Sequence, residues 1–128
     1  MGTRSNIAYE DLDGKIVATY CHWDGYPTGV GETLIHHYNK TTKAEEIANQ
    51  GYLSSLRATL DGSLKDRVHK DAPLIFPSLS TYANSLVDNC ACIEYVYLYK
   101  NNQWHVAEAD SWNFVPLWSV LLRQEVLA

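Results

Sequence analysis

The sequence predicts an α+β fold whose antiparallel sheet is built from two β-hairpins, at about residues 7–23 and 93–110. Each hairpin carries a tight-turn signal, Asp13-Gly14 in the first and Asn101-Asn102 in the second, between segments rich in β-branched and aromatic residues. Three to four helical patterns occupy the rest of the chain, between the hairpins and after the second one. Strands and helices grouped in this way are typical of an α+β domain.

The composition is that of an ordinary globular protein. The chain has 128 residues, of which 46% are hydrophobic and 20% charged, enough for a single domain over residues 1–128. A net charge of −5 without any basic run argues against binding to a nucleic-acid polymer. No apolar stretch reaches membrane-spanning length and no signal peptide is recognisable, so we expect no membrane partner. Three cysteines, two of them in Cys90-Ala91-Cys92, favour a reducing cytoplasm.

The first hairpin is expected to be covered on both faces. A two-residue turn at Asp13-Gly14 fixes which side chains share a face of the sheet. One face would then carry Ile7, Tyr9, Ile16, Ala18, Tyr20 and His22, and the other Ala8, Val17, Thr19, Cys21 and Trp23. Apolar residues occur in both sets.

Two helices are predicted after the first hairpin. The first spans about residues 30–39, with Thr28 as its N-cap and Val30, Leu34 and Tyr38 on one buried face. The second begins at the capping-box pattern of residues 42–45 and ends near Gly51. Residues 53–57 are then expected to form a loop or short turn.

The segment 58–77 reads as an irregular excursion that binds a ligand or meets another subunit. Ser78 is the predicted cap of a third helix over residues 79–87. In the second hairpin the expected cross-strand pairs give one strongly aromatic face. These pairs are Tyr99 with Trp104, Tyr97 with Val106 and Tyr95 with Glu108.

The last helix, residues 117–127 with Pro116 in its first turn, is apolar on nearly all sides. A terminal helix of a small domain cannot cover every side against its own sheet. We therefore expect this helix to form a subunit interface in a homo-oligomer.

Catalytic and metal patterns are weak. Cys21 and His22 are adjacent on a strand, so their side chains point to opposite faces and cannot form a thiolate–imidazole pair. Cys21 could still meet His36, His37 or His105 in space, with Asp110 orienting the imidazole, which leaves a Cys21-dependent hydrolase as one alternative. His36 and His37 are adjacent rather than four residues apart, and Cys90-Ala91-Cys92 has no second pair, so we expect neither a metal nor a cofactor.

A binding site is the more natural interpretation of the glycine-rich stretch 21–31, which joins the first hairpin to a helix. It lacks the Lys-Ser or Lys-Thr of a P-loop. Arg57, with Thr59 nearby, is the best candidate for contacting a phosphate. Aromatic rings could stack on a purine. The predicted ligand-binding residues are Trp23, Asp24, Tyr26, Arg57, Thr59, Tyr82, Trp104 and Trp112.

The head of the chain, in residues 4–8, 13–16, 20–27 and 29–31, resembles small proteins encoded by phages and prophages, and the hairpin from Tyr95 to Trp104 fits the same group. The chain is also similar to the first-described phage anti-Thoeris family. Arg57 and Thr59 resemble the phosphate-binding elements of that family. That resemblance implies a non-enzymatic viral protein in the cytoplasm of the infected bacterium. It would sequester a small cyclic nucleotide signal of the cyclic ADP-ribose type without cleaving it, and some members of the family also bind cyclic oligonucleotides. The other alternative is an anti-CRISPR-type inhibitor that blocks a host effector through an acidic or aromatic patch.

Overall fold

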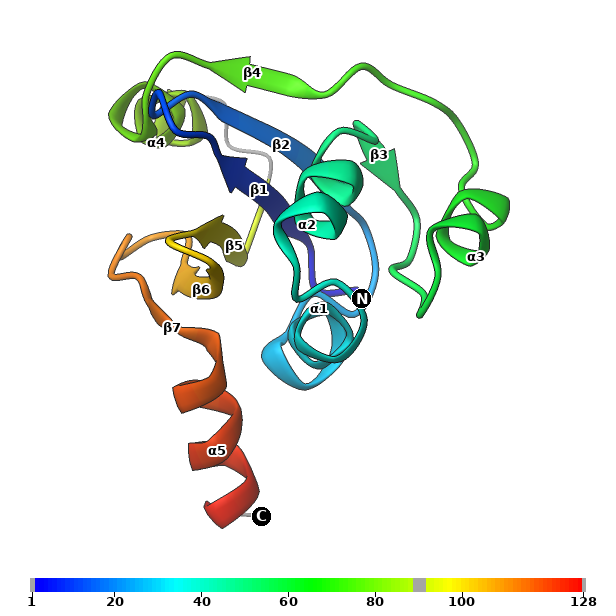
Figure 1. Ribbon diagram of the computed structural model, residues 1–128, viewed down its shortest axis with the longest axis vertical. Coiled ribbons are helices and arrows are strands. Elements are labelled where there is room, and N and C mark those ends of the chain that lie inside the picture. Colours follow the sequence, from blue (N-terminus) through cyan, green and yellow to red (C-terminus); the bar gives the residue numbers. More distant parts are fainter. Residues whose placement is uncertain (1, 89–91, 128) are drawn as a thin grey trace.

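The computed structural model describes residues 2–88 and 92–127, and within them the chain forms a seven-stranded sheet and five α-helices. The strand order is β3-β2-β1-β5-β6-β7, with β4 also paired to β2 (Figure 1). The strands are β1 (Ser5–Glu10), β2 (Ile16–Cys21), β3 (Tyr52–Leu53), β4 (Leu74–Phe76), β5 (Tyr95–Lys100), β6 (Gln103–Glu108) and β7 (Val115–Pro116). The helices are a π-helical turn η1 (Pro27–Gly31), α1 (Glu32–His37), α2 (Thr41–Ala48), α3 (Leu60–Lys65), α4 (Leu79–Asp88) and α5 (Leu117–Leu127).

The predicted α+β fold is confirmed, and both hairpins are antiparallel as expected. The pairing between the two hairpins differs from the predicted antiparallel sheet. Strands β1 and β5 pair in parallel, with Ser5 opposite Tyr95 and Tyr9 opposite Tyr99. A second parallel pair joins β2 to β3, the strand that follows α2. The sheet as a whole is therefore mixed rather than antiparallel throughout.

The second hairpin matches its prediction residue by residue. Asn101 and Asn102 both adopt positive φ, at 52° and 63°, as a two-residue turn of this kind requires. The predicted aromatic pairing follows from this turn, and Tyr99 lies opposite Trp104 while Tyr97 lies opposite Val106.

The register predicted for the first hairpin is wrong by one residue. Glu10 pairs with Ile16, so the connection is a five-residue loop and not a two-residue turn. One Asp11 carboxylate oxygen accepts hydrogen bonds from the backbone N–H groups of Asp13 and Lys15, both at 2.9 Å, and Gly14 takes a φ of 83° beside it. A slip of one residue moves every side chain of the second strand to the other face.

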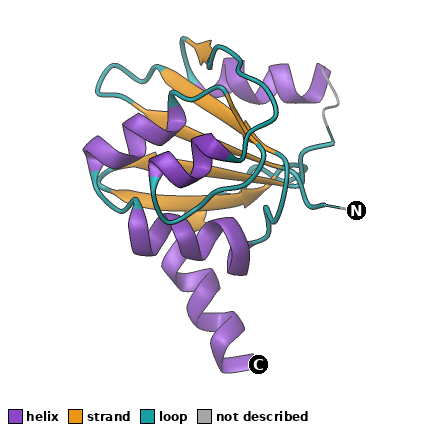
Figure 2. Ribbon diagram, turned by 90° about the vertical axis from the view of Figure 1, so that its right-hand side faces the viewer, coloured by secondary structure: helices purple, strands orange, loops and turns teal. Residues whose placement is uncertain are grey.

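The corrected register sorts the core into two layers. Ile7 and Cys21 face a cluster that includes residues of η1, α1, α2 and α5. Ala8 and Ala18 face the opposite cluster, where Tyr82 of α4 is fully buried. Figure 2 shows the helices distributed over both sides of the sheet.

The helix caps differ from the prediction in three places. Thr28 lies inside η1, whose N-cap position is Tyr26, although Val30, Leu34 and Tyr38 form the predicted buried face. Thr42 lies inside α2, which starts one residue earlier without a side-chain cap. Pro116 belongs to β7 and precedes α5, because it pairs with His105 at the sheet edge.

Residues 52–78 are more regular than predicted. Leu53 belongs to β3, and the expected irregular excursion contains both α3 and β4. Ser78 takes up its predicted capping role, since its hydroxyl accepts a 3.2 Å hydrogen bond from the backbone N–H of Thr81.

Candidate functional site

The glycine-rich loop that follows β2 is anchored at three backbone positions. The hydroxyl of Tyr97, fully buried in β5, donates a 2.6 Å hydrogen bond to the carbonyl oxygen of Gly25. The Gly25 N–H in turn donates to the Thr3 carbonyl at 2.9 Å, and the Val30 N–H donates to the Asp24 carbonyl at 2.8 Å. Asp24 itself takes a φ of 58°. These bonds hold the loop in one conformation against the sheet.

Two predicted ligand residues lie at the exposed tip of this loop. The Tyr26 hydroxyl donates to the Asp24 carboxylate at 3.2 Å, and both side chains are exposed. This hydrogen bond to a negative group raises the pKa of Tyr26. Asp24 and Tyr26 therefore form a surface pair.

The parallel strands β2 and β3 end at the same edge of the sheet, and a pocket of about 480 Å³ opens there. In parallel sheets the carboxyl ends of strands are a frequent location for ligand sites. We call this cavity the edge pocket. It is lined by His22, Trp23, Tyr52, Ser54, Ser55, Arg57, Asp66 and Val68.

Aromatic rings form one side of the edge pocket. Trp23 is 45% exposed and meets the His22 ring edge-on, with 4.6 Å between the ring centroids. The His22 ring is held by a hydrogen bond to Tyr20, since its Nδ1 lies 2.7 Å from the Tyr20 hydroxyl. Tyr52 is stacked on the His69 ring at a centroid distance of 3.8 Å. A planar ligand would thus find two differently oriented aromatic groups.

The cation of the edge pocket is Arg57, whose backbone is fixed on both sides. Its N–H donates to the Ser63 hydroxyl and its carbonyl oxygen accepts from the Tyr38 hydroxyl, each at 2.7 Å. The Arg57 side chain is 57% exposed, and its Nε donates a 2.6 Å hydrogen bond to an Asp66 carboxylate oxygen. The side chain is therefore charged, accessible and anchored at its base.

Residues 66–73, here called the strap, follow α3, and Asp66 and Val68 of this segment line the edge pocket. The Val68 N–H donates to the Ser54 hydroxyl at 3.2 Å, and His69 contributes the ring stacked on Tyr52. Further along, the strap backbone lies directly against Gly51, where a Cβ would come within 1.9 Å of the Asp71 carbonyl oxygen. Gly51 also has a φ of 80°, so this position combines a left-handed backbone with a close approach.

The remaining predicted ligand residues lie elsewhere. Thr59 caps α3, because its hydroxyl accepts a 3.0 Å hydrogen bond from the Gly62 N–H. Tyr82 and Trp104 are 0% and 1% exposed, and each ring makes a buried hydrogen bond, to Asn6 and to the Tyr38 carbonyl respectively. Burial leaves these two rings no free face for a ligand.

Trp112 is half-buried on the opposite side of the sheet from the glycine-rich loop. It meets Tyr82 and Phe114 edge-on, at 5.5 and 5.3 Å between ring centroids. Of the predicted ligand-binding residues, the structure therefore brings together Trp23 and Arg57. Sequence reasoning missed Tyr52 and Ser54, which line the same pocket, and His69, which stacks on Tyr52.

Cys21 does not fit the role of a nucleophile. It is fully buried, and its sulfur contacts the backbone carbonyl oxygen of Trp23 at 3.7 Å. Burial raises the pKa of this thiol to about 12. The reactive form of a cysteine is the thiolate, so Cys21 is held in its inert form at neutral pH.

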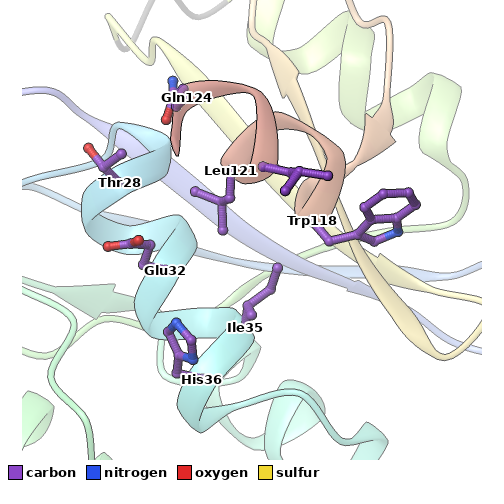
Figure 3. A pocket seen from close by; sticks show the side chains of 8 residues that line it. Thr28, Glu32, Ile35, His36, Trp118, Leu121 and Gln124 are labelled. Carbon is purple, nitrogen blue, oxygen red and sulfur yellow. The ribbon is translucent and has the colours of Figure 1, made fainter. Parts of the chain in front are cut away.

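A second cavity, of about 730 Å³, lies between α1 and α5. Figure 3 shows Leu121 of α5 and Ile35 of α1 pointing toward each other across it. Trp118 and Leu122 of α5 are 56% and 53% exposed. In Figure 1 the helix α5 projects away from the sheet. We call this feature the α1–α5 groove.

Within residues 2–88 and 92–127, no group of three or more His, Cys, Asp or Glu side chains has the arrangement of a metal site. None of the helices that the structure describes has the length and apolar character needed to cross a membrane. Searches with the chain matched no family model, no curated protein and no solved structure.

Proposed function

We propose that this protein binds a small phosphorylated nucleotide in the edge pocket and holds it without converting it. The observation that carries the proposal is the meeting of Trp23 and Arg57 in one cavity at the ends of β2 and β3. An aromatic ring stacks on a base, and a guanidinium is the side chain best suited to a phosphate. Ser54 and Ser55 also line this cavity.

The dimensions of the edge pocket agree with a ligand of this size. Its volume of about 480 Å³ lies within the range of sites for small organic ligands. Its aromatic wall and its charged wall come from different segments, the end of β2 and the chain after β3. A nucleotide has the same division between an apolar base and an anionic phosphate.

The biological role that we propose is viral counter-defence in the cytoplasm of an infected bacterium. The resemblance of the head of the chain to phage proteins supports it, as does the similarity to the anti-Thoeris family. The ligand would then be a cyclic nucleotide immune signal of the cyclic ADP-ribose type, or a cyclic oligonucleotide. Sequestration needs only an affinity and a copy number that exceed the free signal. The protonated, buried thiol of Cys21 favours this binding role over hydrolysis.

A release experiment tests the binding role against catalysis. The protein is incubated with a cyclic ADP-ribose isomer or a cyclic oligonucleotide, separated from free ligand, and then denatured by heat. We expect the retained ligand to be recovered chemically unchanged, as judged by mass spectrometry. Recovery of a converted product would show an enzyme, and failure to retain any of these nucleotides would contradict the proposed ligand class.

We also propose that the α1–α5 groove is covered by a second copy of the chain. The exposed rings and alkyl groups of Trp118 and Leu122 lie on a helix that projects from the sheet. We expect light scattering to give a multiple of the 14.5 kDa chain mass, and Trp118→Ser to reduce it. Leu12→Ser, which changes a fully exposed apolar residue in the β1–β2 loop, is the control and should leave the mass unchanged.

The oligomeric mass also separates the proposed nucleotide-binding protein from a protein–protein inhibitor. A wild-type monomer would leave the exposed Trp118 ring of the groove available as the aromatic patch through which an anti-CRISPR-type inhibitor would block a host effector. In that case a purified host nuclease should bind the wild type and not Trp118→Ser, and nucleotides should produce no rise in melting temperature. A stable homo-oligomer that binds nucleotides contradicts this alternative.

A further inference from the structure

The contact between Arg57 and Asp66 places a carboxylate on the group that would receive a phosphate. The Asp66 oxygen accepts from Nε of Arg57 at 2.6 Å, a short distance typical of a charge-assisted bond. Nε and its neighbouring terminal nitrogen form the edge of a guanidinium that grips carboxylates and phosphates in the same bidentate way. Asp66 therefore holds one of the donors that a bidentate phosphate would need.

Helix stability does not explain the position of Asp66. This residue is the C-cap of α3, where a negative charge is unfavourable because the helix dipole is negative at that end. Lys65, in the last turn of the same helix, has the charge that this position favours. The placement of Asp66 is instead accounted for by its contact with Arg57.

The strap keeps Asp66 in the edge pocket through contacts that do not involve the charged groups of Arg57 and Asp66. The Val68 N–H bonds the Ser54 hydroxyl, His69 stacks on Tyr52, and the backbone at Asp71 rests on Gly51. The ion pair itself is weak, because the Arg57 and Asp66 side chains are 57% and 44% exposed. Ion pairs exposed to this degree contribute little to stability. A phosphate that binds Arg57 can therefore displace the carboxylate.

From these observations we infer that Asp66 is an internal competitor for the phosphate position beside Arg57. It lowers the affinity of the edge pocket for phosphorylated ligands and leaves the affinity for uncharged ones unaffected. The inference rests on the proposed nucleotide-binding function and assigns a specificity-determining residue to it. Asp66 would thus limit how strongly the pocket distinguishes a nucleotide from its nucleoside.

The test compares Asp66→Asn with the wild type by calorimetry, with ADP and adenosine as the probes. Removing the competing Asp66 carboxylate should tighten ADP binding about two- to fivefold, with no change for adenosine. Asp61→Asn, which removes an exposed carboxylate from the first turn of α3, is the matched control and should have no effect on either probe. Thermal unfolding of each variant checks that the fold is retained.

A double-mutant cycle separates competition from general repulsion. If Asp66 acts through Arg57, the gain from Asp66→Asn should vanish in an Arg57→Gln background. The inference is overturned if ADP binds the wild type but Asp66→Asn does not tighten it, if adenosine gains equally, or if the gain persists without Arg57. Absence of ADP binding to both the wild type and Asp66→Asn would contradict the proposed function as well.

Discussion

Tyr97 bonds the carbonyl oxygen of Gly25 through its hydroxyl, so the centre of the second hairpin fixes the loop that leaves the first. Tyr97→Phe removes this donor and leaves a buried carbonyl without it. We expect a loss of about 1–3 kcal/mol in the free energy of unfolding, measured by urea denaturation. Tyr26→Phe removes an exposed hydroxyl and is the control, with an expected change under about 0.5 kcal/mol. Equal effects in the two variants would show that the Tyr97 bond does not anchor the loop.

Cys21 should resist thiol reagents in the folded protein. With a pKa of about 12, roughly one thiol in ten thousand is ionised at pH 8, and burial blocks access as well. The measurement uses Cys90→Ser/Cys92→Ser, which leaves Cys21 as the sole thiol of the chain. We expect labelling only at the rate of unfolding, and rapid labelling in urea. Rapid labelling under native conditions would restore the Cys21-dependent hydrolase as an alternative.

Arg57→Ala should weaken the binding of any phosphorylated nucleotide without unfolding the protein. Charge-assisted hydrogen bonds contribute about 1.5–3 kcal/mol, so calorimetry should show a loss of roughly 10- to 100-fold. The melting temperature should change little, because the ion pair with Asp66 is exposed. Arg123→Ala, which removes an exposed arginine of α5, should leave the affinity unchanged. Unaltered binding in Arg57→Ala would exclude the edge pocket as the phosphate site.

His105 makes the stability depend on pH. Burial lowers its pKa, with Lys100 adding to the effect, so the folded protein keeps this imidazole neutral where the unfolded chain takes up a proton. Stability is therefore complete above the unfolded pKa of about 6.5 and falls as the pH decreases below it, by up to about 1.4 kcal/mol per pH unit.

Denaturation at pH 7.5 and pH 5.5 checks this expectation. The loss on acidification should be smaller in His105→Leu than in the wild type, since the variant has no group to protonate there. His37→Gln, at an exposed position of α1, should retain the full loss. A wild-type loss that persists in His105→Leu would assign the effect to other groups.

The two hairpins show why local patterns predict some elements and miss others. Two consecutive asparagines, both with positive φ, favour a two-residue hairpin turn. That turn sets the pairing of the flanking strands, so the register of the second hairpin could be predicted from the sequence. Asp13-Gly14 is compatible with more than one loop length. The choice is made by the Asp11 side chain, which bonds two backbone N–H groups and shifts the pairing by one residue.

The edge pocket was predictable only in part, because its two walls meet through long-range pairing. Trp23 and Arg57 could be predicted from residue type alone, because an indole stacks on a base and a guanidinium binds a phosphate. Tyr52, by contrast, enters through a two-residue strand, too short to show alternation, and Asp66 enters through the strap. Tyr82 and Trp104 were candidates because they are aromatic, a property that does not distinguish buried rings from exposed ones.

The parallel pairing of β1 and β5 has a consequence for the folding kinetics. The two hairpins can form from local contacts within microseconds, but β1 and β5 meet only when the chain carrying α1, α2, α3 and α4 closes into a loop. Closing a loop of this length carries an entropic cost before any strand contact compensates for it. We therefore expect the pairing of β1 with β5 to form more slowly than either hairpin.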